Sequence, residues 1–242
     1  MTSRDTGSTD VRDLLRVGGG TSRRVTAVDF VRNTLRAGIL RGELPGDYRL
    51  VQTDLAEHLG VSTTPVREAM RDLASEGLIV MDSHRVGRVR RPDWDEMVEI
   101  VEMRRSLERL AVTRSMDNIT DEELQRAWDI ADTLAAEEDV GSWVQNNIRF
   151  HDVFHQATRT KRLSGILTAL EHAGGVFVAQ AQRLDPEIRR RAVADHFSLL
   201  EAYELKDVDQ AVQIQDAHVG LPLAAYERQD GKTEGPVGQT ST

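Results

Sequence analysis

Apolar and polar positions follow a helical pattern and then a strand pattern between residues 23 and 92. Apolar residues recur three or four positions apart at Val28, Val31, Leu35 and Ile39. This spacing predicts a first helix with one apolar face, which Gly42 and Pro45 end. A second, short helix is predicted over residues 55–59, before Gly60.

The third predicted helix carries Val66, Met70 and Leu73 on its inner face. Ser62 or Thr63 can cap it, and Pro65 lies in its first turn. Two short strands follow, 78–81 and 86–90, joined by the polar turn 82–85. Three helices and a hairpin within about 70 residues predict a winged helix-turn-helix domain.

Residues 93–228 show helical periodicity without strand alternation. Six helices are predicted, at roughly 93–116, 120–138, 140–159, 162–183, 186–205 and 207–227. Thr120 and Glu123 have the spacing of a capping box at the start of the second of these helices. Long helices with short connections predict an antiparallel bundle.

The fold prediction is therefore mostly α, in two folded domains with a flexible segment at each end. The expected segments are a flexible arm over 1–22, a winged helix-turn-helix domain over 23–92, a helical domain over 93–228 and a disordered tail over 229–242. The arm contains Gly18-Gly19-Gly20, and the tail is polar and rich in glycine.

Composition narrows the class of protein. Hydrophobic residues make up 39% of the chain and charged residues 29%, which is typical of a globular protein. The absence of cysteine excludes disulfides, thiolate-bound zinc and thiol catalysis. No apolar stretch is long enough for a membrane span, and the first residues lack the apolar core of a secretion signal, so a cytoplasmic location is expected.

Charge is distributed unevenly. The net charge is −9, but the region from Arg23 to Pro92 holds 12 basic and 9 acidic residues. The rest of the chain holds 19 basic and 31 acidic residues. Because an acidic surface repels phosphate, any contact with DNA is expected in the first domain.

A known family accounts for the motifs of the first domain. The run from Leu55 to Leu73, followed by Glu76-Gly77-Leu78-Ile79, closely resembles the winged helix of the GntR family. Residues 39–42 and Pro45-Gly46 extend the match. The resemblance implies a transcription regulator, which binds DNA through this domain.

The helical domain resembles the FCD effector domain of the FadR subfamily. The matching positions are Arg104 to Glu108, Asn147-x-x-Phe150-His151, His196 and His218. The expected six-helix length favours the VanR-like branch. The resemblance implies that this domain dimerises and binds a small carboxylate, and that a divalent metal is held by one aspartate and three histidines, as in many members.

The third helix is the expected DNA-contacting element, since an α-helix fits the major groove. Its candidate contacts are Ser62, Thr63, Thr64, Arg67 and Arg71, and the hairpin adds Arg85 and Arg88 as a wing. Arg67 can bind guanine bidentately, and hydroxyl groups can bind phosphate or bases. The family often has arginine at the position of Thr63, so an altered operator is expected. The alternatives are capping for the hydroxyls, a helix ion pair of Arg67 with Glu68 or Asp72, and a solvated hairpin.

The metal candidates are Asn147, His151, His196 and His218. Asn147 and His151 share a helix face, and zinc or nickel suits the imidazoles. Asn147 stands where the family usually has aspartate. The amide brings no charge, so metal affinity should fall and an anionic effector should matter more. The alternative is a group of core histidines bonded to one another and to water.

The effector candidates are Arg104, Gln180 and Arg183. A guanidinium group can clamp a carboxylate bidentately, although Arg104 can instead pair with Glu108 one turn later.

Three functions remain open at this point. The first is a repressor that binds a near-palindromic operator as a homodimer under effector control. The second is a metal-dependent enzyme in a helical bundle, which the lack of an H-E-x-x-H motif disfavours. The third is a DNA-binding protein without an effector.

Overall fold

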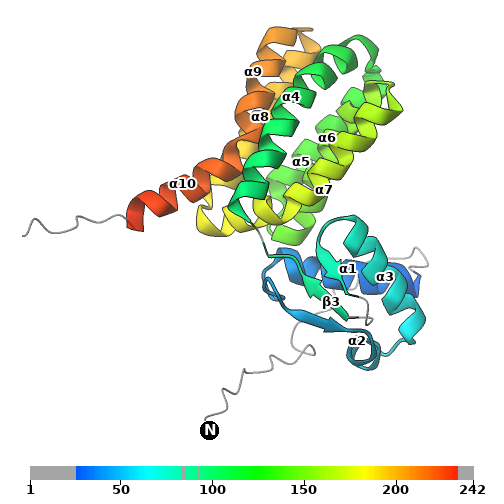
Figure 1. Ribbon diagram of the computed structural model, residues 1–242. Coiled ribbons are helices and arrows are strands. Elements are labelled where there is room, and N and C mark those ends of the chain that lie inside the picture. The colour runs from blue at the N-terminus through cyan, green and yellow to red at the C-terminus, as the bar shows by residue number, and fades with distance from the viewer. Residues whose placement is uncertain (1–25, 83–85, 92, 234–242) are drawn as a thin grey trace, which may run out of the picture. The chain divides into compact units, whose positions relative to one another are not determined.

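The computed structural model describes residues 26–82, 86–91 and 93–233, and the contacts divide the chain into two compact units, before and after the Arg91–Pro92 bond. Figure 1 shows a small mixed unit and a larger helical one. The expected arm over 1–22 lies outside the described residues. No described helix is long and apolar enough to cross a bilayer.

Over residues 26–82 and 86–91, the N-terminal unit contains three helices and a three-stranded antiparallel sheet. Its elements are α1 (Ala27–Leu40), β1 (Arg49–Val51), α2 (Gln52–Leu59), α3 (Thr63–Ser75), β2 (Ile79–Met81) and β3 (Val86–Val89). The strand order is β1-β3-β2. The three helices and the hairpin match the predicted pattern, whereas β1 was not predicted. Three residues are too few to show the strand alternation that sequence analysis relies on.

The apolar faces of α1 and α3 form the core of this unit. Val31 and Leu35 of α1 and Met70 and Leu73 of α3 are almost completely buried. Gly60 ends α2 with φ 65°, a left-handed conformation that glycine adopts without strain, and so turns the chain toward α3.

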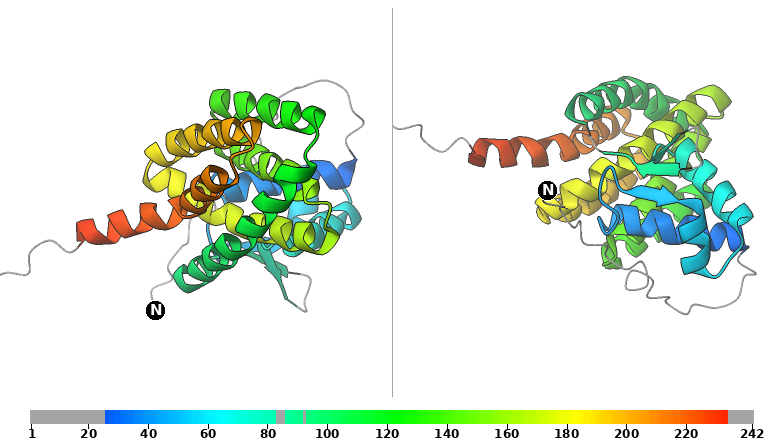
Figure 2. Two further views of the ribbon diagram at one scale, coloured as in Figure 1. Left: turned by 90° about the horizontal axis from the view of Figure 1, so that it is seen from above. Right: turned by 60° about the horizontal axis from the view of Figure 1, so that its bottom comes forward.

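The C-terminal unit consists of seven helices in the residues that the structure describes. They are α4 (Trp94–Asn118), α5 (Asp121–Ala136), α6 (Val140–Ala157), α7 (Lys161–Leu184), α8 (Glu187–Glu204), α9 (Val208–Val219) and α10 (Leu221–Thr233). Helices α4 to α9 pack side by side as a bundle, and the C-terminal end of α10 extends away from it in all views of Figures 1 and 2. The predicted capping box of Thr120 and Glu123 starts α5.

The prediction of one last helix over 207–227 was wrong. The structure has two helices there, and α9 ends at Gly220. Pro222, the second residue of α10, has no N–H to donate to the carbonyl of His218, so the hydrogen-bond ladder breaks at this point. Helix α10 also continues to Thr233, into residues that were expected to belong to a tail.

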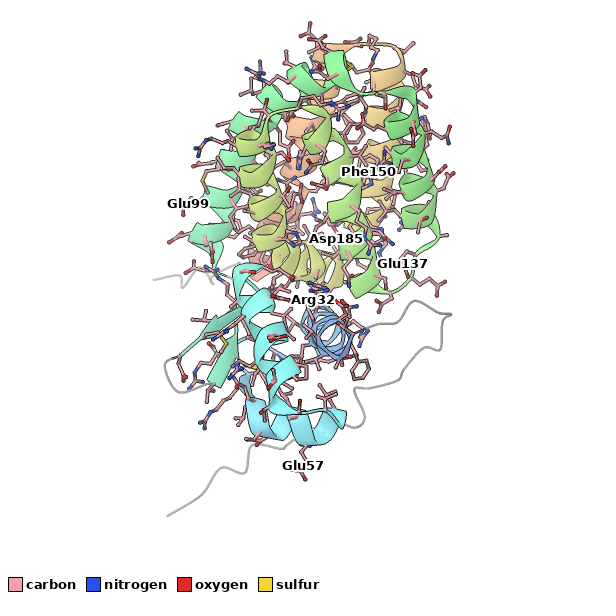
Figure 3. All side chains as sticks on the ribbon, turned by 90° about the vertical axis from the view of Figure 1, so that its right-hand side faces the viewer. Arg32, Glu57, Glu99, Glu137, Phe150 and Asp185 are labelled. Carbon is pink, nitrogen blue, oxygen red and sulfur yellow. The ribbon has the colours of Figure 1, made fainter. Side chains whose placement is uncertain are left out.

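Large aromatic side chains fill the centre of the bundle. Trp143, Phe150 and Tyr203 are at most 1% exposed, and Figure 3 shows Phe150 among the helices. The Tyr203 hydroxyl lies 2.6 Å from the Ser115 hydroxyl, so the buried phenol has a hydrogen-bond partner. This core holds α6, α8 and α4 around the polar residues described next.

Candidate DNA interface and effector cavity

Helix α3 turns its polar face to solvent. Its inner face is buried against α1, whereas Ser62, Thr63, Thr64 and Arg71 are exposed. Ser62 has the backbone conformation of an N-cap, but its side chain makes no capping hydrogen bond. The three neighbouring hydroxyls at the start of the helix are therefore available to a ligand such as DNA.

Arg67 lies one turn after these hydroxyls and is half-buried. The ion pairs considered from the sequence are not formed: Asp72 accepts instead from Arg32 at 3.1 Å. Within the described residues, no acidic side chain pairs with Arg67, and its Nε is buried without a partner. The guanidinium group is thus held beside the exposed helix face without an internal counter-ion.

The exposed face of the sheet adds a basic residue that sequence analysis missed. Arg88 of β3 is directly opposite Arg49 of β1 and Val80 of β2, and all three are exposed. Like charges directly opposite on a sheet repel each other, and a phosphate between them would relieve this repulsion. Recognising β1 from the sequence would have revealed the pair. Arg85, the other predicted wing residue, lies outside the described residues.

In the C-terminal unit, three histidines from different helices converge. His151 comes from α6, His196 from α8 and His218 from α9, and one nitrogen of each lies within 4.8 Å of the others. His151 Nε2 and His218 Nε2 are 3.1 Å apart, and His218 Nδ1 lies 3.4 Å from Asp195 Oδ2. Both ring nitrogens of His196 are buried without a partner.

Two of these imidazoles, those of His151 and His196, are held in the neutral form that ligates metals. Burial lowers the pKa of His151 well below its ordinary value, and the neighbouring His218 and His196 lower it further. Burial likewise lowers the pKa of His196 well below its ordinary value, with a smaller contribution from His218. At neutral pH both rings therefore carry a free nitrogen lone pair.

A small cavity opens beside the histidines. It is lined by Arg104, Trp143, Asn147, Val178, Gln182, Ile188, Ala192, His218, Val219, Leu221 and Pro222. Its volume of about 20 Å³ holds one water-sized species. The Asn147 carbonyl oxygen Oδ1 is buried without a partner. The four residues predicted as metal ligands thus lie in or next to one buried site.

Arg104 belongs both to the cavity and to a buried charge cluster. We call Arg104, Glu108, His155 and Glu171 the Arg104 cluster. The Nη2 atom of Arg104 donates to Glu171 and lies 3.4 Å from Glu108 Oε1, whereas its Nε is without a partner. The ion pair with Glu108 that the sequence suggested is therefore present, together with a second one from α7.

His155 completes this cluster through Glu108, because its Nε2 lies 3.1 Å from Glu108 Oε1. Burial acts to raise the pKa of Glu108, but the charge of His155 and its hydrogen bond, followed by Arg104, outweigh burial and lower the pKa to about 2. Burial acts to lower the pKa of His155, yet Glu108 raises it. Burial raises the pKa of Glu171, although Arg104 opposes this. The Arg104 guanidinium lies between Glu108 and Glu171, where a metal ion bound by these two glutamates would otherwise lie.

The structure places the other two effector candidates outside the cavity lining. Arg183 is exposed and Gln180 is half-buried, and neither lines the cavity. Gln182, between them in sequence, lines it instead. Successive helix residues point about 100° apart, so a choice among these three positions needs the rotation of α7, which the sequence does not give.

Comparisons with known proteins agree with both units. The family model described as bacterial regulatory proteins, gntR family, matches residues 27–88, and the FCD domain model matches residues 99–221. The chain belongs to the GntR family and carries an FCD domain. The regulator is 28% identical over 216 residues to a probable D-xylose utilization operon transcriptional repressor of Paenarthrobacter nicotinovorans, covering 88% of this chain and 95% of that protein.

The regulator is also 25% identical to the HTH-type transcriptional regulator McbR of Escherichia coli K12, over 87% of this chain and 99% of McbR. A solved structure of E. coli McbR/YncC has a TM-score of 0.69, covering 85% of this chain and 99% of that chain. At 23% identity, this likeness shows the fold. The regulator is therefore a DNA-binding transcription regulator with an effector domain, and the alternative of a metal-dependent enzyme is wrong.

Proposed function

We propose that the regulator is a repressor whose affinity for its operator is controlled by a small carboxylate, which binds at the cavity of the C-terminal unit and widens it beyond the space of one water. One observation carries this proposal: a buried cavity collects Arg104, Asn147 and His218 from three helices, with polar atoms left unpartnered. Buried polar groups without partners are costly, so such a site is built for a ligand. Repression is also the activity given in the name of the Paenarthrobacter relative.

DNA binding is assigned to the exposed face of α3, with Ser62, Thr63, Thr64 and Arg67 contacting the major groove and Arg71 contacting phosphate. Arg88 is assigned to the phosphate backbone beside it. The support is the exposure of the hydroxyl residues, Arg71 and Arg88, and the lack of an internal ion pair for the half-buried Arg67. The operator is selected from random duplex DNA and titrated in a gel shift at fixed salt. Release of the operator by a carboxylate supports effector control, and an affinity that no acid changes would favour the effector-free alternative.

The residues present fit a divalent metal, zinc or nickel, held by Asn147, His151, His196 and His218. The supporting observation is His196, because a buried imidazole with two unpartnered nitrogens is not explained by hydrogen bonds among the histidines. Asp195 next to His218 is the kind of carboxylate that orients a ligating imidazole. A bound metal would supply a positive charge that attracts an acid. The usual aspartate of the family would bring a negative charge to the metal, and Asn147 does not. The two glutamates of the Arg104 cluster do not supply that charge, because they are already paired with Arg104 and His155.

Thermal unfolding tests the metal. After treatment with a chelator, added zinc, nickel or manganese should raise the melting temperature, because an ion at 100 times its dissociation constant adds about 2.7 kcal/mol. His196→Ala should abolish the rise. His172→Ala, which changes a half-buried histidine outside this site, is the matched control. An unchanged melting temperature with every ion would show that the histidines form a metal-free pocket.

The regulator is proposed to act as a homodimer through the exposed side of α4 and α7. These neighbouring helices leave Met103, Leu110 and Ile166 between 39% and 51% exposed. Gly165 has no atom within 4 Å of an added Cβ, so a second backbone can approach there. A single recognition helix contacts only a few base pairs, so a second copy is the partner that DNA binding requires.

Sedimentation tests this face. Ile166→Glu should give monomers and weaken operator binding, because the interface would have to bury an unpaired charge. Leu205→Glu is the matched control, since Leu205 is 75% exposed on another part of the unit. Dimers that persist in the Ile166 variant would place the interface elsewhere.

Two assignments remain proposals. A cytoplasmic location is expected of a protein that acts on DNA. The assignment to the VanR-like branch was based on an expected six helices, whereas the described part of the unit has seven. Only Gly220 separates α9 from α10, so the two together cover the stretch that was expected to be the sixth helix, and the branch is kept as a proposal.

A further inference from the structure

The cavity of the C-terminal unit is closed around a space of about 20 Å³, which holds one water-sized species. A larger ligand therefore has to move part of its wall. Six helices supply the lining, and α10 contributes its first two residues, Leu221 and Pro222. Pro222 is buried and Leu221 is half-buried. Widening of the cavity depends on the wall that the bundle holds least firmly.

Helix α10 is that wall. Within the described residues it packs chiefly on α7, and its C-terminal end extends away from the bundle (Figures 1 and 2). Each of the other lining helices packs extensively on two bundle helices or more. Pro222 has no N–H, so the hydrogen-bond ladder is interrupted between α9 and α10. The end of α9 is held in place, because Arg105 Nε of α4 donates to the Asp216 carbonyl at 3.3 Å. Helix α10 can therefore move while α9 stays where it is.

Tyr226, in the second turn of α10, joins this helix to the bundle. Its ring packs in two apolar clusters, one with Met97 of α4 and Phe177 of α7, and one with Ile188, which lines the cavity. The ring also meets Trp94, the first residue of α4, edge to face at 6.1 Å between the ring centres. Among the α10 side chains that the structure describes, Tyr226 alone takes part in both clusters. Its ring thus holds α10 against the bundle.

The hydroxyl group of Tyr226 opposes the position that the ring stabilises. Its oxygen is buried and has no hydrogen-bond partner among the described residues. Burial raises the pKa of Tyr226 to about 12, although Arg183 acts to lower it, so the hydroxyl is protonated at neutral pH. A buried hydroxyl without a partner is costly, and moving α10 outward would expose it to water. This cost favours an open position of α10.

We propose that α10 is a lid over the cavity, that it turns about the junction at residues 220–222, and that Tyr226 is its latch. The effector enters while the lid is open, since the closed form has room for one water. This inference rests on the proposed function, because the lid serves a ligand that the closed cavity cannot hold. Opening also withdraws the Tyr226 ring from Trp94, so the lid acts on the first residue of α4.

Hydrogen exchange of the full-length protein without ligand, measured by mass spectrometry, tests the lid. A detached helix of 13 residues is marginal in water, so opening exposes its amides to exchange. Peptides from α10 should exchange faster than peptides from α4 to α9. Tyr226→Phe removes the costly hydroxyl and should slow exchange in α10 at least about fivefold, whereas Tyr226→Ala removes the ring and should speed it up. Glu227→Ala, at the next, exposed position, is the matched control and should leave the rate unchanged.

Acids of different size test whether the lid controls the cavity. The probes are acetate and benzoate, each titrated calorimetrically with zinc present and absent. An acid that binds only the open form has an apparent affinity proportional to the open fraction. The affinity for benzoate should therefore rise in Tyr226→Ala and fall at least about fivefold in Tyr226→Phe, and the affinity for the smaller acetate should change less. Because Tyr226→Phe keeps the ring, the test does not depend on folding of the alanine variant.

The outcomes distinguish the lid from carboxylate control. Exchange in α10 that is no faster than in the bundle, or that Tyr226→Phe leaves unchanged, would overturn the lid and leave carboxylate control standing. Equal changes in the affinities for acetate and benzoate would also overturn it, because opening would then not be what admits the larger acid. Exchange as expected, with neither acid bound by a protein that still binds its operator, would support the movement of α10 and count against carboxylate control.

Discussion

The charge cluster around Glu108 offers the sharpest test of how the effector domain is stabilised. Glu108→Gln keeps the shape of the side chain and removes its charge. The change leaves the ring of His155, 3.1 Å away, beside a neutral amide, and removes one of the two acids that face Arg104. All of these groups are buried. The domain should therefore lose stability, because a buried charge without its partner is costly.

The size of the loss follows from the pKa of Glu108. Burial alone would raise it, but His155 and Arg104 lower it from the ordinary value of 4.5 to about 2. A difference of this size between the unfolded and folded states corresponds to about 3 kcal/mol at neutral pH. Because the folded-state pKa is the lower one, this stabilisation is complete above the unfolded-state pKa. It is lost as the pH falls from about 4.5 toward 2.

Urea unfolding followed by tryptophan fluorescence measures this loss. The three tryptophans of the chain, Trp94, Trp128 and Trp143, all lie in the C-terminal unit, so the signal comes from that unit alone. Glu99→Gln is the matched control, because Glu99 is an exposed glutamate on the same helix (Figure 3). The difference between the wild type and Glu108→Gln should narrow below about pH 4.5.

Two results would refute this reasoning. Equal stability of the Glu108 and Glu99 variants at pH 7 would show that the cluster adds nothing to the net stability of the domain. A difference that stays constant down to pH 3 would show that the stabilisation does not depend on the charge of Glu108.

Three further predictions concern DNA and metal. Arg67→Ala should weaken specific operator binding by about 1–3 kcal/mol in a gel shift at fixed salt, whereas Arg114→Ala, at an exposed position of α4, should not. Asn147→Asp should raise zinc affinity at least about tenfold in a competition assay with a chelating dye, because it adds a charge to the ligand set; an unchanged affinity would exclude this residue as a ligand. Zinc should still raise the melting temperature at pH 6.5, the ordinary pKa of histidine, because the pKa values of His151 and His196 lie well below it and both rings are neutral there. Loss of the effect as the pH falls to 6.5 would contradict this.

The sequence predicted most of the fold, because the helices are long and their apolar residues recur regularly. The elements it missed depend on contacts or on single residues. The strand β1 is formed by three residues that pair with β3, and pairing across 35 or more positions leaves no local pattern. The break between α9 and α10 depends on Pro222, whose effect was hidden in an otherwise continuous apolar pattern.

The candidate site was predicted where residues share a helix and missed where helices meet. Asn147 and His151 are one turn apart, so their common direction follows from helix geometry. The contact of His155 with Glu108 joins α6 to α4, and only packing of the two helices brings these residues together. Gln182 was missed for the same reason, because its place in the cavity lining depends on the rotation of α7.

Helix α4 has a mechanical consequence for signalling. It is an unbroken helix of 25 residues, about 37 Å long, and it starts two residues after the boundary between the units. The cavity residue Arg104 and the exposed residues Met103 and Leu110 lie on different sides of this one rod. An unbroken hydrogen-bond ladder resists twisting, so a ligand that displaces Arg104 should turn α4 as a whole. Rotation of the helix would then move two places at once: its first residues, which follow the boundary between the units, and the exposed side that carries Met103 and Leu110.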